Sequence, residues 1–190
     1  MSEPHPQAAL PIRTARLVLR PYDDGDLDAF HDIHRREDVT RYLPWGPRSR
    51  DEVRVIVERR KSLTRLERDG DGLCLVVVLM HTGAVVGDVD LQLHSREHHQ
   101  GEVGYVIHPD HQGNGYATEA TAAMLRVGFE TYGLHRIVGR LDARNDASAR
   151  VLERLGMRRE AHLRENEFLK GEWTDEVLYA ILADEWRPRA

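Results

Sequence analysis

Apolar residues alternate with polar ones, or form short apolar runs, in seven segments of the chain that follows residue 14. Such segments are typical of β-strands. They cover residues 15–21, 73–80, 84–93, 101–108, 136–143, 160–169 and 176–186. The short "HTG" between the second and third segments predicts a hairpin, and the last two form an antiparallel pair around "KGEWTD".

Apolar residues spaced three or four positions apart predict helices between these strands. The predicted helices cover residues 27–36, 49–70, 117–133 and 146–157. Strands and helices do not alternate regularly, so the order predicts an α+β layer arrangement and not a doubly wound sheet. No internal repeat is present.

The chain length favours one core, because 190 residues are enough for one domain and few for two. Pro4, Pro6 and Pro11 oppose regular structure at the start. We therefore expect a flexible arm over residues 1–11 and a single domain over residues 12–190.

The loop "PDHQGNGYATEA", residues 109–120, is rich in glycine for a plain connection between a strand and a helix. The first amides of a helix lack partners within it and suit an anion such as a pyrophosphate. Gly113 and Gly115 would let the backbone approach that anion without a Cβ in the way. The spacing matches neither of the usual nucleotide motifs, so glycines alone leave open a turn that merely joins two elements.

Composition and charge exclude several other classes. A net charge of −5 argues against general nucleic-acid binding, which needs a basic footprint. The basic run "ERRKSLTRLER" is interpreted as a solvated helix face, with a polyanion site as the alternative. Cys74, in an apolar run, is expected in the core and excludes an internal disulfide. Neither a signal peptide nor a membrane-length apolar run occurs, which predicts a cytoplasmic protein without a membrane partner.

The 11 histidines raise the question of a metal site. The densest groups, "REHHQ" and "HPDH", lie in loops, with neither paired thiolates nor the helical H-E-x-x-H spacing. We therefore expect no bound metal.

The segment "QGNGYA" resembles the Q/R-x-x-G-x-G/A loop of the GNAT superfamily of acetyl-CoA-dependent N-acetyltransferases, with Gln112, Gly115 and Ala117 at the defining positions. The similarity extends over residues 12–187, in the branch of the ribosomal-protein N-terminal (alanine and serine) acetyltransferases. Its segments, in order, are "TARLVLRP", "GEVGYVIHPDHQGNGYATEA", "NDASARVLERLGM", "RREAHLRE" and "GEWTDEVLYAILADEW". Nothing diagnostic lies between residues 42 and 66, where acceptor contacts usually lie.

The resemblance implies a mostly antiparallel sheet of about seven strands flanked by helices, in which two strands splay apart to form the coenzyme A cleft. Acetyl-CoA would be the cosubstrate. A backbone N–H near Val106 or Ile107 would stabilise the oxyanion, and that strand edge would pair with the pantetheine arm. The residues implied in pyrophosphate binding are Gln112, Gly113, Asn114, Gly115, Tyr116 and Ala117.

Acetyl transfer from a thioester to an amine needs a proton acceptor for the attacking nitrogen. Glu102 is the first candidate, although a carboxylate at the mouth of a strand can be merely solvated. Asp88 and Asp90 are the next candidates.

Asn145 and Ser148 form an N-x-x-S unit at a helix start. Capping alone would explain them. The resemblance implies instead that Ser148 donates to the coenzyme sulfur and that Asn145 contacts the pantetheine arm. Tyr105 is interpreted as a core residue.

The predicted function is acetyl transfer to a primary amine, on a peptide N-terminus or a small molecule, by direct attack in a ternary complex. The alternative is a non-catalytic acyl-CoA-binding regulatory module, against which Glu102, Asn145 and Ser148 together argue. The protein would be a monomer or a homodimer.

Overall fold

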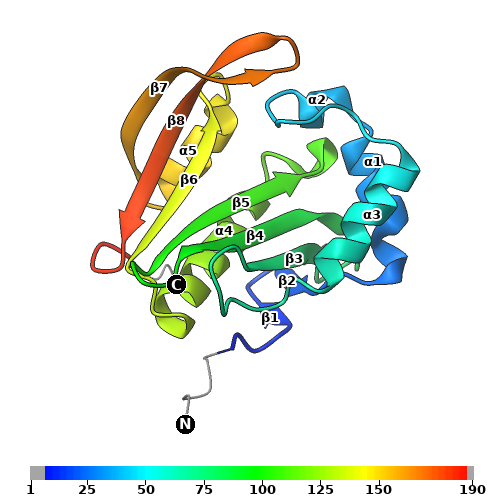
Figure 1. Ribbon diagram of the computed structural model, residues 1–190. Helices are drawn as coiled ribbons and strands as arrows, with labels where there is room; N and C mark the ends of the chain where they lie inside the picture. Colours follow the sequence, from blue (N-terminus) through cyan, green and yellow to red (C-terminus); the bar gives the residue numbers. More distant parts are fainter. Residues whose placement is uncertain (1–6, 188–190) are drawn as a thin grey trace.

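Eight strands form one open sheet in the computed structural model, which describes residues 7–187 (Figure 1). Their order across the sheet is β1-β2-β3-β4-β5-β6-β8-β7. Their bounds are β1 Ile12–Arg13, β2 Leu17–Arg20, β3 Gly72–Leu79, β4 Val85–Ser95, β5 Gln100–Ile107, β6 Arg136–Asp142, β7 Arg158–Leu169 and β8 Glu172–Leu182. Every neighbouring pair is antiparallel except β5 with β6. The α+β, mostly antiparallel arrangement is confirmed, with eight strands in place of about seven because the two-residue β1 pairs with β2.

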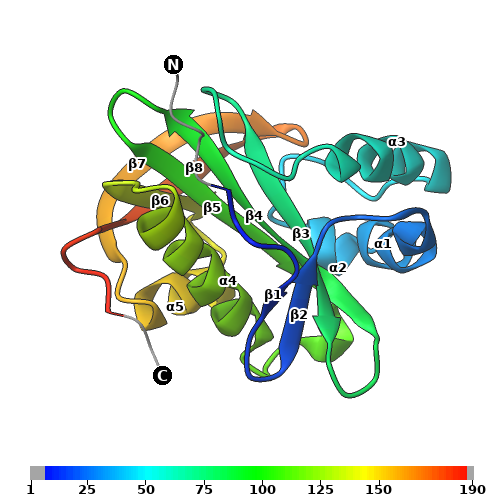
Figure 2. The ribbon, with the colours of Figure 1, turned by 90° about the horizontal axis from the view of Figure 1, so that it is seen from below.

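Helices cover both faces of the sheet (Figure 2). α4 and α5 lie on one face, and α1 and α3 lie on the other. The bounds are α1 Leu27–His34, α2 Glu37–Thr40, α3 Arg50–Lys61, α4 Tyr116–Arg126 and α5 Asp146–Arg154, with a π-helical turn at Val127–Thr131 and 3₁₀ turns at Asp24–Asp26 and Pro109–His111. Within residues 7–187, no helix is both long and apolar enough to cross a membrane.

Alternation along the strands divides the interior into two cores. Val89 and Leu91 of β4 belong to the larger core, which also contains Met124 of α4. The smaller core joins α1 and α3 to the other face of β3, through residues that include Cys74 and Val76. Burial raises the pKa of the Cys74 thiol to about 12, so Cys74 is the neutral core residue expected from the sequence.

The predicted helix over residues 49–70 is wrong in its second half. Ser49 and Glu52 form a capping box that starts α3, but the helix ends at Lys61. The following chain runs along β3: Thr64 forms a bridge with Leu73, and the carbonyl of Leu63 accepts from the amide of Cys74 at 2.8 Å. Pairing with the strand thus overrides the helical spacing.

The expected N-terminal arm, residues 1–11, is described only in part. Residues 1–6 of the expected arm lie outside the described residues. Ala8 and Leu10, further along the arm, are partly buried and pack against the larger core. The described part of the arm therefore contacts the domain that follows it.

The parallel pair β5–β6 is short. Only Gln100–Glu102 align with Arg136–Val138, at the beginning of each strand. Beyond Glu102, β5 continues beside β4 and β6 continues beside β8, so the two strands separate. The splayed pair expected from the resemblance is present, and it opens toward the start of α4.

Candidate active site

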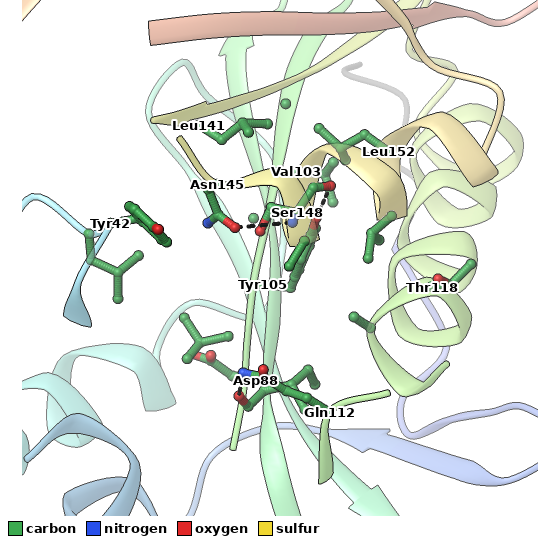
Figure 3. Close-up of a pocket in the computed structure, with 18 of the residues that line it drawn as sticks. Tyr42, Asp88, Val103, Tyr105, Gln112, Thr118, Leu141, Asn145, Ser148 and Leu152 are labelled. Atoms are coloured by element: carbon green, nitrogen blue, oxygen red, sulfur yellow. Dashed lines mark hydrogen bonds between the residues drawn. The ribbon is translucent and has the colours of Figure 1, made fainter. Parts of the chain in front are cut away.

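A cavity of about 660 Å³ lies where β5 and β6 separate (Figure 3). Its walls come from β4, β5, the start of α4, the end of β6, α5 and the segment around α2. The structure brings together Glu102, Val106, Ile107, Gln112, Gly113, Gly115, Tyr116, Ala117, Asn145 and Ser148 around it. Asp88 and Asp90 line it too, but Asn114 does not.

In the loop before α4, the amide of Gln112 donates to the carbonyl of Pro109 at 3.1 Å, and the amides that follow it remain available. Gly115 has a φ of 80°, and the first hydrogen bond within α4 runs from the amide of Glu119 to the carbonyl of Gly115 at 3.0 Å. The earlier amides have no partner within the helix. Gln112 turns its side chain back to the carbonyl of Ile107 at 3.0 Å, which fixes the loop to the end of β5. Arg150 and Arg154 of α5 also line the cavity and add positive charge.

Arg16 braces this loop, a role that no pattern in the sequence predicts. Its amide donates to Oε1 of Glu119 at 2.8 Å, and its guanidinium donates to Oε2 at 2.7 Å. The guanidinium also donates to the carbonyl of Asn114 at 2.9 Å and lies over the ring of Tyr116. Asn114 therefore shapes the loop from outside the cavity, where its own side chain donates to two loop carbonyls.

Asn145, Ser148 and Tyr105 meet at the start of α5 (Figure 3). Oδ1 of Asn145 accepts from the amide of Ser148 at 3.1 Å, so Asn145 does cap the helix. The Tyr105 hydroxyl donates to the carbonyl of Ser148 at 3.0 Å, and burial raises the pKa of this hydroxyl to about 12. Tyr105 packs against the larger core and also lines the cavity, where it holds α5 in place.

Glu102 of β5 also lines the cavity. Its carboxylate lies 3.3 Å from Nε2 of His94 and 3.3 Å from Nε of Arg140, and its side chain is 25% exposed. Burial raises the pKa of Glu102. The positive charge of Arg140 lowers this pKa, and the negative charges of Asp90 and Glu176 raise it further. A half-buried carboxylate with an increased proton affinity is suited to accept a proton.

The two alternative carboxylates differ in how they are held. Asp88 is buried, accepts from the Tyr22 hydroxyl at 2.5 Å and forms an ion pair with Arg60. The Asp90 carboxylate accepts from the side-chain amide of Gln92 at 3.1 Å, and burial raises the pKa of Asp90. Asp90 is therefore the better placed of the two to take up a proton.

The interpretation of the basic run "ERRKSLTRLER" as a solvated helix face is wrong for Arg60, which is mostly buried. Its guanidinium lines the cavity, and its side chain is 18% exposed. The buried Asp88 offsets the cost of taking this charge out of water. Arg60 lies three positions after Val57 and seven after Val53, so helical spacing places it on the buried face of α3.

The side of the cavity next to α2 carries no sequence motif. Val39 of α2, followed by Tyr42, Leu43 and Trp45, supplies its apolar wall. Lys170, in the β7–β8 turn, donates to the carbonyls of Thr40 and Arg41 at the end of α2. The β7–β8 hairpin therefore reaches across to this wall (Figure 1). Among residues 7–187, no group of His, Cys, Asp and Glu is arranged to hold a metal ion.

A splayed strand pair that opens onto a glycine loop at a helix start defines the class of coenzyme A-dependent N-acyltransferases. The family model described as "Acetyltransferase (GNAT) domain" matches residues 16–158, and the chain belongs to this family of acetyltransferases. The resemblance found in the sequence is confirmed.

Two curated relatives are similar over nearly the whole chain. The uncharacterized N-acetyltransferase YnaD of Bacillus subtilis is 32% identical over 176 residues, which are 92% of this chain and 98% of the relative. The [ribosomal protein uS5]-alanine N-acetyltransferase of Escherichia coli is 27% identical over 182 residues, which are 93% of each chain. The ribosomal-protein branch is thus among the relatives.

Solved structures share the fold. A GNAT-family acetyltransferase from Bacillus anthracis superimposes with a TM-score of 0.82 at 32% identity, over 92% of this chain and 99% of that chain. Spermidine N-acetyltransferase from Vibrio cholerae, in complex with CoA and spermine, has a TM-score of 0.76 at 24% identity, over 90% of this chain and 98% of that chain. The second likeness shows the fold alone.

Proposed function

We propose that the protein transfers the acetyl group of acetyl-CoA to a primary amine by direct attack in a ternary complex. The observation that carries this proposal is the placement of Glu102, Ser148 and the glycine loop around one cavity. A binding module without catalysis would have no need for a half-buried carboxylate opposite the coenzyme end.

Acetyl-CoA fits the chain's own groups. Within residues 112–117, the amides that follow Gln112 would bind the pyrophosphate, helped by the positive end of α4, while the Gln112 amide already donates to the carbonyl of Pro109. A Cβ at position 113 or 115 would enter the space that the phosphates need. Because Oδ1 of Asn145 is used in capping, Nδ2 is the group left to contact the pantetheine arm.

In the proposed reaction, the neutral amine attacks the thioester carbonyl while Glu102 accepts a proton from the nitrogen, directly or through a water. A backbone N–H near Val106 or Ile107 donates to the oxyanion. The tetrahedral intermediate then collapses, the C–S bond breaks, and Ser148 donates to the departing thiolate. No covalent enzyme intermediate forms.

The acceptor is proposed to be a peptide N-terminus or a small-molecule amine. The Escherichia coli relative, named for the alanine of a ribosomal protein, supports the first. A sequence relative, the spermidine N(1)-acetyltransferase of Vibrio cholerae, is 25% identical over 177 residues and supports the second. The carboxylates of Asp90 and Glu102 would attract either amine in its protonated form.

Release of free thiol from acetyl-CoA tests the proposal directly. The panel should contain alanine- and serine-starting peptides, polyamines, aminoglycosides and free amino acids. We expect at least one amine to raise thiol release well above hydrolysis without acceptor and to become acetylated, as mass spectrometry can show. Acetyl-CoA binding with no turnover on any amine would favour the regulatory module.

Replacing Ser148 by alanine is expected to lower kcat by about tenfold to a hundredfold, because a hydrogen bond to a charged group contributes about 1.5–3 kcal/mol. Negative charge develops on the sulfur only as the C–S bond breaks, so the Kd for acetyl-CoA should change much less. Calorimetry and a chemistry-limited assay measure the two effects. Ser62→Ala, at an exposed serine after α3, is the control. An unchanged kcat would leave Ser148 with only a structural role.

A further inference from the structure

A buried glutamate on β8 lies behind the proposed base. Glu176 is 8% exposed and faces Asp142 of β6 in the sheet. A buried carboxylate needs partners to offset its desolvation. Glu176 has two of them, one on each side.

The first partner comes from an irregularity in β7. The pairing register of β7 with β8 shifts between Leu163 and Glu167, and Glu165 has a left-handed φ of 48°. Within this segment, Nδ2 of Asn166 donates to Oε2 of Glu176 at 2.7 Å. The bulge thus directs the side chain of Asn166 toward Glu176, which regular pairing of β7 with β8 would not do.

The second partner is Arg140 of β6. Its terminal nitrogen donates to Oε1 of Glu176 at 2.8 Å, and its Nε lies 3.3 Å from Oε2 of Glu102. One guanidinium therefore bridges two carboxylates, with the shorter contact to Glu176.

The other groups that face Glu102 do not replace this cation. From β4, His94 lies 3.3 Å away, and burial together with Arg140 lowers its pKa, so it favours the neutral form. Asp90, also on β4, is a carboxylate that opposes the charge of Glu102. Arg140 is thus the one cation that these contacts place beside Glu102.

We infer that Glu176, held by Asn166, is a positioning residue that shares Arg140 with Glu102 and so keeps this arginine from pairing fully with the proposed base. The inference rests on the proposed role of Glu102. Without the charge of Glu176, Arg140 stabilises the Glu102 carboxylate more strongly, and a more stable carboxylate is a weaker base.

Glu176→Gln tests the inference with little change in shape. We expect the acidic limb of the kcat/KM profile to move to lower pH by about one unit, with a lower plateau. A carboxyl ¹³C NMR titration of Glu102 should shift in the same direction. Arg140→Met should shift both measurements toward higher pH, because it removes the cation.

Glu172→Gln is the matched control. Glu172 lies on the same strand, but it is exposed and pairs with Arg144 at 2.8 Å. This variant should move neither measurement.

The outcomes separate the inference from the proposed function. An unmoved titration of Glu102 in folded Glu176→Gln overturns the inference. A shifted titration without a shift of the kinetic limb upholds the sharing of Arg140 and overturns Glu102 as the base. Should Glu176→Gln fail to fold, Arg140→Met decides, and an unmoved Glu102 titration there also overturns the inference.

Discussion

Glu102→Gln is expected to lower kcat/KM near neutral pH by about a hundredfold to ten-thousandfold with a true acceptor, the range typical of general-base help. Glutamine keeps the size of the side chain but cannot accept the proton from the attacking amine. The amide oxygen of glutamine can still accept a hydrogen bond from Arg140 or His94, so we expect the site to keep its shape. Thiol release at saturating acetyl-CoA measures the loss.

The pH profile gives the sign of the effect. Burial raises the pKa of Glu102, so the acidic limb of the parent's activity should lie above the ordinary range of a carboxylic acid, with activity rising as Glu102 loses its proton. The variant should lack this limb. Alkaline pH should partly rescue it, because more of the acceptor is then already neutral.

Glu97→Gln, at an exposed glutamate in the β4–β5 turn, is the control and should retain parental activity. If Glu102→Gln retains nearly parental kcat/KM at pH 7, Glu102 is not the base. Asp90 would be the next carboxylate to replace, since Arg60 and Tyr22 already engage Asp88. If Asp90 is not the base either, the next hypothesis is that water alone removes the proton.

Local sequence patterns were enough to predict the parts of the fold that depend on residues close together in the sequence. The strand predicted over residues 84–93 is β4, and its alternation agrees with Val89 and Leu91 in the larger core and Asp88 and Asp90 on the opposite face. The glycine loop could be located because a strand, two glycines and a helix follow one another directly. The same locality explains the cap that Asn145 provides.

Contacts between distant segments could not be predicted in this way. Helical spacing puts Arg60 on the buried face of α3, but it does not show that Arg60 pairs with Asp88, 28 positions away on another element. The arginine that braces the loop, Arg16, meets Glu119 across 103 positions. The wall around Tyr42 has no periodic pattern, since it is built from short segments held by tertiary contacts such as that of Lys170. Single-sequence spacing contains no information on such pairs.

Gly115→Val is expected to weaken acetyl-CoA binding by about a hundredfold or more, which corresponds to about 2.7 kcal/mol. Two effects combine. A β-branched residue is strained at a φ of 80°, at a cost of about 1–3 kcal/mol. Its Cβ would also lie 3.4 Å from the guanidinium of Arg16, which braces the loop, next to the amides that are proposed to bind the pyrophosphate. Calorimetric titration with acetyl-CoA measures the Kd.

The control must separate the lost anion site from backbone strain. Gly70 has a φ of 88°, with no heavy atom within 4 Å of an added Cβ, and it does not line the cavity. Gly70→Val should therefore bear a similar strain and lose a similar few degrees of Tm, but it should bind acetyl-CoA as the parent does. Equal losses of binding in the two variants would attribute the effect to general destabilisation. A folded Gly115→Val that binds acetyl-CoA like the parent would show that the pyrophosphate does not bind at residues 112–117.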